Sequence, residues 1–295
     1  MIGWRSHQQW FKLFLSADTF FFCMKITSLV DNISHPPFLS EHGLSLHIVT
    51  QQGLRLLFDM GQGTLFHENA LCSGIDITQT DHAVISHGHY DHGGGLSAFL
   101  QHNHKARVWV AERAFEPHYS QHVDEGMRYI GLSSELEHHP QVKMVQGTVR
   151  IAAGITLFSD VKGRVCFPKG NRRLFGPTMT QHDDFCHEQN LIIEEGSIIS
   201  LFAGCAHHGI VNILERCREV IGRYPTHVFA GMHLMKSSEH PLFLQELAHQ
   251  LAMIPHCTYY TMHCTGLEAF TRLQQLLPGR IHYLACGDNV TLPSD

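Results

Sequence analysis

The stretch "HGHYDH", residues 87–92, places three imidazoles and one carboxylate directly after an apolar run. His87 and His89 are two residues apart, so at the end of a strand they point to one side and can hold one ion together. The following turn carries Asp91 and His92 toward a neighbouring position, and the surrounding glycines free the backbone for it. Imidazole nitrogens and carboxylate oxygens suit zinc, with iron and manganese as alternatives. We therefore predict a site for one or two divalent ions per chain.

Further ligands have to come from elsewhere in the chain. His207 in "GCAHHGIVN" and His263 in "YYTMHCTG" each follow an apolar stretch and precede a glycine or a Thr-Gly pair. Loops of this kind line clefts, and we predict that both histidines are ligands. His208 is left open, because it could face away from its neighbour. Cys205 and Cys264 flank the predicted ligands and are interpreted as small buried packing residues.

The elements that must position these residues alternate between strands and helices. Residues 45–63 read as two strands joined at Gln52-Gly53, and residues 113–150 and 166–189 read as irregular. Helices are predicted from Leu96 and over 210–222, 240–254 and 267–277. The other predicted strands are those beginning at Met24, before His87, and over 106–112, 154–161, 190–195, 197–209, 226–234, 257–266 and 281–287. Two β-rich halves that each end in histidine-bearing loops indicate an α+β fold, with two sheets face to face and helices outside.

Composition narrows the class of protein. The chain has 295 residues, 43% of them hydrophobic, and a formal net charge of −6 with no basic stripe, which argues against a nucleic-acid partner. Nine cysteines without a CxxC pair indicate reduced thiols and a cytoplasmic location. The aromatic run at 10–23 is too short to span a bilayer, so no membrane partner is expected. We predict one domain over 24–295, preceded by an extension, 1–23, whose membership in the natural protein stays open.

"HGHYDH" matches the HxHxDH signature of the metallo-β-lactamase superfamily, and the chain resembles that superfamily from about Met24 to its end. The resemblance implies a four-layer αββα sandwich with a binuclear metal site between the sheets. It also implies that Asp59 accepts a hydrogen bond that orients a metal ligand. The ligands it implies are His87, His89 and His207 for the first ion, and Asp91, His92 and His263 for the second.

A narrower resemblance is carried by "LLFDMGQG", "DDFCHEQNLII" and "MHCTG". These motifs are similar to the branch that contains the archaeal 7,8-dihydropterin-6-methyl-4-(β-D-ribofuranosyl)aminobenzene-5′-phosphate synthase. Most members of that branch are known only as metal-dependent hydrolases, so the branch does not fix a substrate.

The sequence departs from the usual pattern of superfamily hydrolases, which carry an aspartate that bridges the two metals. No aspartate lies between His207 and His263, and His233 stands at the expected place. An imidazole offers one nitrogen to one ion and cannot bridge as a carboxylate does. Either the second ion is held more loosely, or His233 binds one ion; the alternative is that His233 is a buried polar residue.

The predicted activity is hydrolysis by a metal-activated water, with Asp91 as both ligand and catalytic proton acceptor. A site without a bridging carboxylate keeps one more positive charge, which favours a small anionic substrate, phosphorylated or carboxylated. Lys169, Arg172 and Arg173 act in the same sense if they face the cleft; otherwise they form a solvated surface. The alternatives are a synthase of the dihydropterin type and a non-catalytic metal-dependent binding protein. A flavodiiron reductase is disfavoured because residue 89 is His, and the oligomeric state stays open.

Overall fold

A computed structural model describes residues 23–235 and 240–293 of the chain. Apart from Cys23, the predicted N-terminal extension lies outside the described residues. The strands are β1 Met24–Val30, β2 Ser45–Val49, β3 Arg55–Phe58, β4 His82–Ile85, β5 Arg107–Ala111, β6 Tyr119–His122, β7 Gly126–Tyr129, β8 Val142–Val145, β9 Thr148–Ala152, β10 Ile155–Phe158, β11 Leu174–Phe175, β12 Asn190–Glu195, β13 Ile198–Ala203, β14 His227–Ala230, β15 Thr258–Thr261, β16 Ile281–Tyr283 and β17 Asn289–Leu292. The α-helices are α1 Leu65–Cys72, α2 Tyr90–Gly93, α3 Leu96–His102, α4 Ile210–Ile221, α5 Pro241–Ala252 and α6 Leu267–Leu276.

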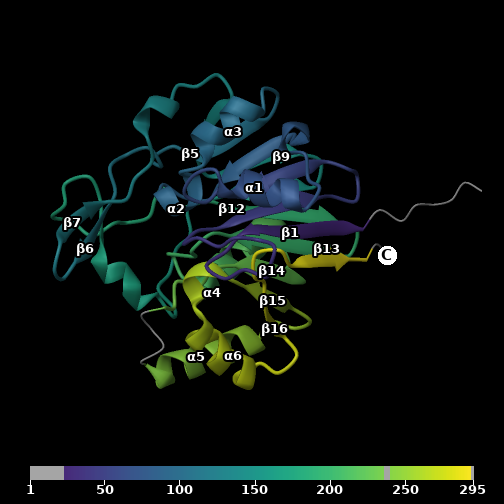
Figure 1. Cartoon of the computed structure of the whole chain (residues 1–295). Helices are drawn as coiled ribbons and strands as arrows, with labels where there is room; N and C mark the ends of the chain where they lie inside the picture. Colours follow the sequence, from purple (N-terminus) through teal and green to yellow (C-terminus); the bar gives the residue numbers. More distant parts are fainter. Residues whose placement is uncertain (1–22, 236–239, 294–295) are drawn as a thin grey trace, which may run out of the picture.

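Two seven-stranded sheets face each other, with helices on both outer surfaces (Figure 1). One apolar cluster fills the space between the sheets, with Phe58 from the first sheet 6.0 Å from Phe202 of the second, measured between ring centroids. A second cluster joins the first sheet to α1 and α3, and a third joins the second sheet to α4, α5 and α6. The predicted four-layer αββα sandwich is therefore confirmed.

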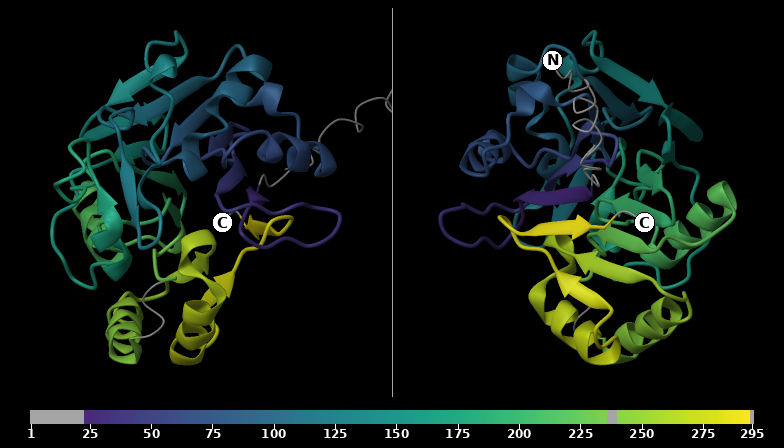
Figure 2. Two further views of the ribbon diagram at one scale, coloured as in Figure 1. Left: turned by 60° about the vertical axis from the view of Figure 1, so that its left-hand side comes forward. Right: turned by 90° about the vertical axis from the view of Figure 1, so that its right-hand side faces the viewer.

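The strand order places many carboxyl ends along one edge of the sandwich. The first sheet runs β17-β1-β2-β3-β4-β5-β8 and the second β16-β15-β14-β13-β12-β10-β9. Strands β3, β4, β5 and β8 are parallel, as are β13 to β16. The last strand, β17, pairs with the first, β1, so the two ends of the described chain meet in one sheet (Figure 2). Loops that follow parallel strands are the usual place for ligand sites in such sheets.

Turn chemistry accounts for several local features of the structure. Gly53 and Gly196 have positive φ values of 82° and 59° in the turns of the β2–β3 and β12–β13 hairpins. Glycine adopts this left-handed conformation without the steric cost that other residues carry. Helix α4 ends at Gly222, whose φ of 77° and bond to the carbonyl of Arg218 form a left-handed C-terminal cap.

Residues 113–150 differ from the prediction of an irregular segment. They contain β6, β7, β8 and most of β9, and β6 and β7 join β11 in a small third sheet. All eight residues of β6 and β7 are partly or fully exposed, so the alternation that marks a half-buried strand is absent from the sequence. Strand β17 was also not predicted. Within the described ranges, no helix has the length and apolarity needed to cross a bilayer.

Candidate metal centre

The predicted site residues follow strands whose carboxyl ends lie at one edge of the sandwich. Asp59 follows β3, His87 follows β4, and His263 follows β15. The backbones of Asp59 and His263 have positive φ values of 60° and 49°, as does that of His233, at 49°. A residue other than glycine with positive φ carries a conformational cost on the order of 1–3 kcal/mol, and such residues occur often at functional sites.

The first predicted triad is assembled and buried. The Nε2 atom of His87 lies 3.0 Å from Nδ1 of His89 and 3.3 Å from Nε2 of His207. His87 and His207 are fully buried, and His89 is 4% exposed. Ligands of one tetrahedral zinc lie at similar separations, because each zinc–nitrogen bond is roughly 2.0–2.1 Å long. These three imidazoles could therefore bind one ion together.

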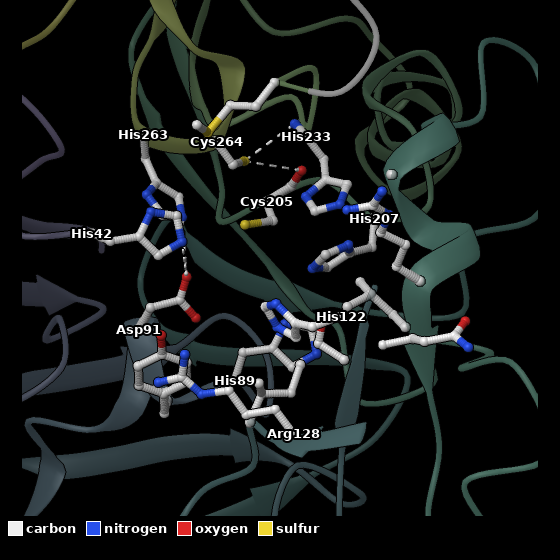
Figure 3. Close-up of a pocket in the computed structure, with 18 residues that line it drawn as sticks. His42, His89, Asp91, His122, Arg128, Cys205, His207, His233, His263 and Cys264 are labelled. Carbon is white, nitrogen blue, oxygen red and sulfur yellow. Dashed lines mark hydrogen bonds and ion pairs between the residues drawn. The ribbon is translucent and has the colours of Figure 1, made fainter. Parts of the chain in front are cut away.

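The second predicted triad is assembled beside the first. The Nε2 atoms of His92 and His263 are 3.2 Å apart, and Asp91 Oδ2 lies 3.4 Å from the Nε2 of His263 and 3.9 Å from that of His92. The rings of His87 and His92 have centroids 4.1 Å apart, so the two triads adjoin. Figure 3 shows Asp91 and His263 on one side of the cavity and His207 on the other.

Oxygen acceptors fix which ring nitrogen faces the site. Asp59 Oδ2 accepts a hydrogen bond from Nδ1 of His92 at 2.7 Å, and Asn32 Oδ1 accepts one from Nδ1 of His263 at 2.8 Å. With both Nδ1 protons used in this way, the two Nε2 atoms point lone pairs at each other at 3.2 Å. Such a pair needs a positive charge beside it, either a proton or a bound cation.

The same logic applies to the first triad. Nδ1 of His207 lies 2.9 Å from Asn171 Oδ1, and Nδ1 of His87 lies 2.9 Å from Ser86 Oγ. The Ser86 hydroxyl and backbone N–H both donate to Asp59, each at 2.7 Å. Asp59 thus orients His92 directly and His87 through Ser86, which is the kind of outer contact that metal-binding histidines commonly have.

Burial and neighbouring charges prepare these groups for a cation. Burial, together with the neighbouring imidazoles, lowers the pKa of His87, His89 and His207 well below the usual value. Burial alone would raise the pKa of Asp91, but His92 and hydrogen bonds from other imidazoles lower it well below its usual value. Neutral imidazoles and an ionised carboxylate are the forms that bind metal ions.

A cavity of about 280 Å³ opens above the two triads. His89, Asp91, His207, His233 and His263 line its inner end (Figure 3). The outer wall comes from the small third sheet and from the residues directly after β7 and directly before β11. It comprises Ser120, Gln121, His122, Arg128, Ile130, Arg173 and Leu174.

The three cations considered from the sequence are placed differently. Arg173 lines the cavity, whereas the Nζ atom of Lys169 lies 5.7 Å from the centroid of the Phe243 ring. Arg172 is exposed and does not line the cavity. Arg128, on β7, lines the cavity and was not identified from the sequence, because it lies in the segment read as irregular.

His233 and His208 also take different places. The ring of His233 packs on that of His207, with centroids 4.5 Å apart, and its backbone N–H donates to Cys264 Sγ at 3.2 Å. His208 turns away from the triads, and its Nδ1 lies 2.7 Å from Glu188 Oε2. Glu188 also accepts the backbone N–H of His207 at 2.5 Å, so it holds the loop that carries this predicted ligand.

Several residues of the site were missed by sequence reasoning. His42 contacts Asp91, with Nε2 3.2 Å from Oδ2, and Asp31 accepts the backbone N–H of His263 at 2.5 Å. Asn32 and Asn171 orient two of the imidazoles. The pair "DN" at 31–32, directly after a buried strand, is a signal of the same kind as Asp59 and could have been recognised.

A second group of titratable residues lies behind the first triad. Asp183 Oδ2 is 3.0 Å from Nδ1 of His118 and 3.1 Å from Nε2 of His187, and all three side chains are buried. Nδ1 of His187 accepts the backbone N–H of Gly88 at 2.9 Å, so its proton is on Nε2 and is donated to Asp183. The group is therefore a carboxylate held by two imidazoles and tied to the HxH turn.

The chain is similar to known proteins over most of its length. The family model of the metallo-beta-lactamase superfamily matches residues 48–187. A crystal structure described as a metal-dependent hydrolase of the beta-lactamase superfamily is 30% identical, with a TM-score of 0.79, over 92% of this chain and 100% of that one.

Two proteins of Methanocaldococcus jannaschii are also similar. One, described as uncharacterized, is 27% identical over 85% of this chain and 94% of its own length. The other, 7,8-dihydropterin-6-methyl-4-(beta-D-ribofuranosyl)-aminobenzene-5'-phosphate synthase, is 24% identical over 83% of this chain and 89% of its own length. The αββα sandwich, the HxHxDH turn and the matched lengths together lead to one conclusion: the chain belongs to the metallo-β-lactamase superfamily, whose members are mostly metal-dependent hydrolases.

Proposed function

We propose that the protein is a metal-dependent hydrolase that acts on a small anionic substrate. The observation that carries this proposal is the meeting of two ligand triads at the inner end of one cavity. The buried Nε2 atoms of four histidines converge there, and each ring has its Nδ1 beside an oxygen, namely His87, His92, His207 and His263.

These donors fit divalent ions. Nitrogen-rich sites with one carboxylate suit zinc, and we propose zinc with one or two ions per chain, iron and manganese being the alternatives. Bound there, such ions would supply an activated water and polarise an ester, amide or phosphoester. His87, His89 and His207 would hold the first ion, and Asp91, His92 and His263 the second.

Asp91 is the proposed proton acceptor. It is 8% exposed at the cavity wall, and its Oδ2 contacts the Nε2 atoms of His42 and His263 at 3.2 and 3.4 Å. The side chain of His42 is 49% exposed, so it can exchange a proton with solvent. A proton taken by Asp91 from the attacking water could leave through His42 or pass to the departing group.

The cations of the cavity wall support an anionic substrate. Arg128 and Arg173 line the outer part of the cavity, and His122, on β6, lines it as well. A guanidinium binds phosphate and carboxylate groups through two parallel hydrogen bonds. A phosphorylated or carboxylated molecule could therefore place its charged group at the third sheet and its reacting centre at the triads.

A second candidate is a synthase of the dihydropterin type. It is favoured by the 24% identity to the archaeal synthase over most of both chains. In that case the same site would bind a phosphorylated ribosyl substrate, and bond formation would replace net hydrolysis. A non-catalytic metal-dependent binding protein is the third candidate.

The test is a substrate panel on the purified protein. We expect one to two divalent ions per chain by elemental analysis, turnover of at least one class of phosphoester or carboxylated ester, and loss of activity on chelation with recovery on adding metal. Reactions with pterin and phosphoribosyl precursors test the synthase. Full metal content without turnover in either panel would favour the binding protein instead.

The setting of the activity is also proposed. Eight cysteines described in the structure, from Cys72 to Cys286, are free thiols, which supports a reducing compartment such as the cytoplasm. The proposed partner is a small molecule rather than nucleic acid or a membrane.

A further inference from the structure

Cys205 lies between the two triads. Its Sγ atom is 3.2 Å from Nε2 of His92, and the residue is 3% exposed. In Figure 3 its sulfur lies between the Asp91–His263 side of the cavity and the His207–His233 side. A packing residue, as the sequence suggested, would not need its sulfur in this position.

Three different sets of possible ligands share this sulfur. It lies within 4.8 Å of ring nitrogens of His87 and His92, and the same limit holds for those of His207 and His233. It also groups with His263 and the sulfur of Cys264. The sulfur therefore adjoins members of both triads, which is the place a bridging ligand has to occupy.

We propose that Cys205, as a thiolate, bridges the two metal ions in place of the aspartate that this chain lacks. Zinc–sulfur bonds are roughly 2.3 Å long, and a thiolate has several lone pairs, so it can bind two ions where an imidazole nitrogen binds one. On metal binding the S–H bond breaks, the proton passes to solvent, and sulfur–metal bonds form.

This assignment changes the charge of the centre. A thiolate supplies the negative charge that a bridging carboxylate would supply, so the centre does not keep the additional positive charge expected from the absence of aspartate. The preference for an anionic substrate then depends on Arg128 and Arg173 in the cavity wall.

Cys264 provides the matched comparison within the chain. Its sulfur is hydrogen-bonded to the protein backbone. It accepts the N–H of His233 at 3.2 Å and lies 3.8 Å from the carbonyl oxygen of Cys205. It lies next to His263 in the chain, so a sulfur signal from the centre could arise from either cysteine until each is replaced.

The test uses cobalt(II) in the metal-free full-length protein under a phosphine reductant. We expect the wild-type protein to bind two ions and to develop a sulfur-to-cobalt charge-transfer absorption in the near ultraviolet. Cys205→Ser should lose this absorption and hold the second ion at least tenfold more weakly, whereas Cys264→Ser should keep both properties. Cys205→Asp should regain the second ion without the absorption, because a carboxylate can bridge.

The inference rests on the proposed metal centre but not on hydrolysis. Two bound cobalt ions without the charge-transfer absorption in the wild-type protein would overturn the role of Cys205 and leave the centre standing, whether or not any variant folds. Loss of the absorption in Cys264→Ser with retention in Cys205→Ser would also overturn it. Failure to bind cobalt at all would overturn the centre itself.

Discussion

At the scale of single residues, the hydrogen bond that each imidazole makes through Nδ1 determines whether its Nε2 can bind a cation. The Nδ1 atoms of His92, His207 and His263 lie beside oxygens of Asp59, Asn171 and Asn32. Each Nδ1 proton is thereby directed away from the cavity, and each Nε2 is left available to bind a cation. Histidine count alone could not distinguish these residues from surface histidines.

The first prediction concerns the tighter ion. His87→Ala, His89→Ala or His207→Ala should each remove most of its affinity, because the site is left with two protein ligands. The change is measured as metal per chain after gel filtration. His208→Gln is the control, because His208 faces Glu188 rather than the triad and should retain the ion. Equal metal content in the His207 and His208 variants would show that the triad is misassigned.

The second prediction concerns the cations of the cavity wall. Arg128→Ala and Arg173→Ala should each weaken competitive inhibition by inorganic phosphate by roughly 10-fold or more, since hydrogen bonds to charged groups contribute about 1.5–3 kcal/mol. Metal content should not change. Lys169→Ala is the control, because its ammonium lies over Phe243 and not in the cavity wall. If all three variants bind phosphate equally, the site that binds the anionic group of the substrate lies elsewhere.

At the scale of elements, the HxH turn is fixed from behind. The loop before β12 carries His187, whose ring accepts the N–H of Gly88, and Asp183, which accepts from His187 and His118. A Cβ added to Gly88 would lie 2.4 Å from the carbonyl oxygen of Ala114, so the turn fits only with glycine. The third sheet, β11-β6-β7, likewise shapes the cavity from outside the sandwich.

The third prediction tests that support. Asp183→Asn should lower the affinity of the first ion by about 10–100-fold, the range found for residues that orient metal ligands, because His187 would lose the carboxylate that holds its ring against the backbone of the HxH turn. The affinity is measured by competition with a chromophoric chelator. Asp184→Asn is the matched control, since the neighbouring carboxylate is 64% exposed and contacts Arg113. Identical affinities for both variants would limit the Asp183 group to a packing role.

At the scale of the whole molecule, the pairing of β1 with β17 brings the two ends of the described chain together in one sheet. The proposal that 24–295 is one domain leads to the fourth prediction. A chain that begins at Met24 should melt at the same temperature as the full chain, within error, and keep its metal. A drop of more than a few degrees, measured by calorimetry, would show that residues 1–23 contribute to the folded protein.

The fifth prediction concerns acid stability. His47, in β2, is 5% exposed, and burial with nearby Arg55 and Lys25 lowers its pKa to about 4. The unfolded chain takes up a proton at this residue below about pH 6.5 while the folded chain stays neutral, so stability falls as the pH falls. The unfolding free energy should therefore fall between neutral pH and about pH 5, and His47 should account for about 2 kcal/mol of that fall. In His47→Leu the fall should be smaller by this amount. Urea titrations of both metal-free proteins at the two pH values measure it, and equal losses would contradict it.

The sequence by itself determined the alternation of strands and helices, the expectation of two facing sheets with helices outside, the HxHxDH cluster and the candidate ligands His207 and His263. These follow from local patterns: apolar runs, turn glycines and the spacing of side chains along one strand. Among the strands that were missed, β6 and β7 were misread for a local reason as well, because they are short and largely exposed and carry no clear alternation.

The tertiary structure decided what depends on distance between segments far apart in the chain. It placed Arg128 and Arg173 on one cavity, turned His208 away while His207 faces inward, and set Cys205 between both triads. Sequence spacing cannot order such contacts, because adjacent residues after a strand point to opposite sides, and the packing of two separate sheets selects which side faces the site.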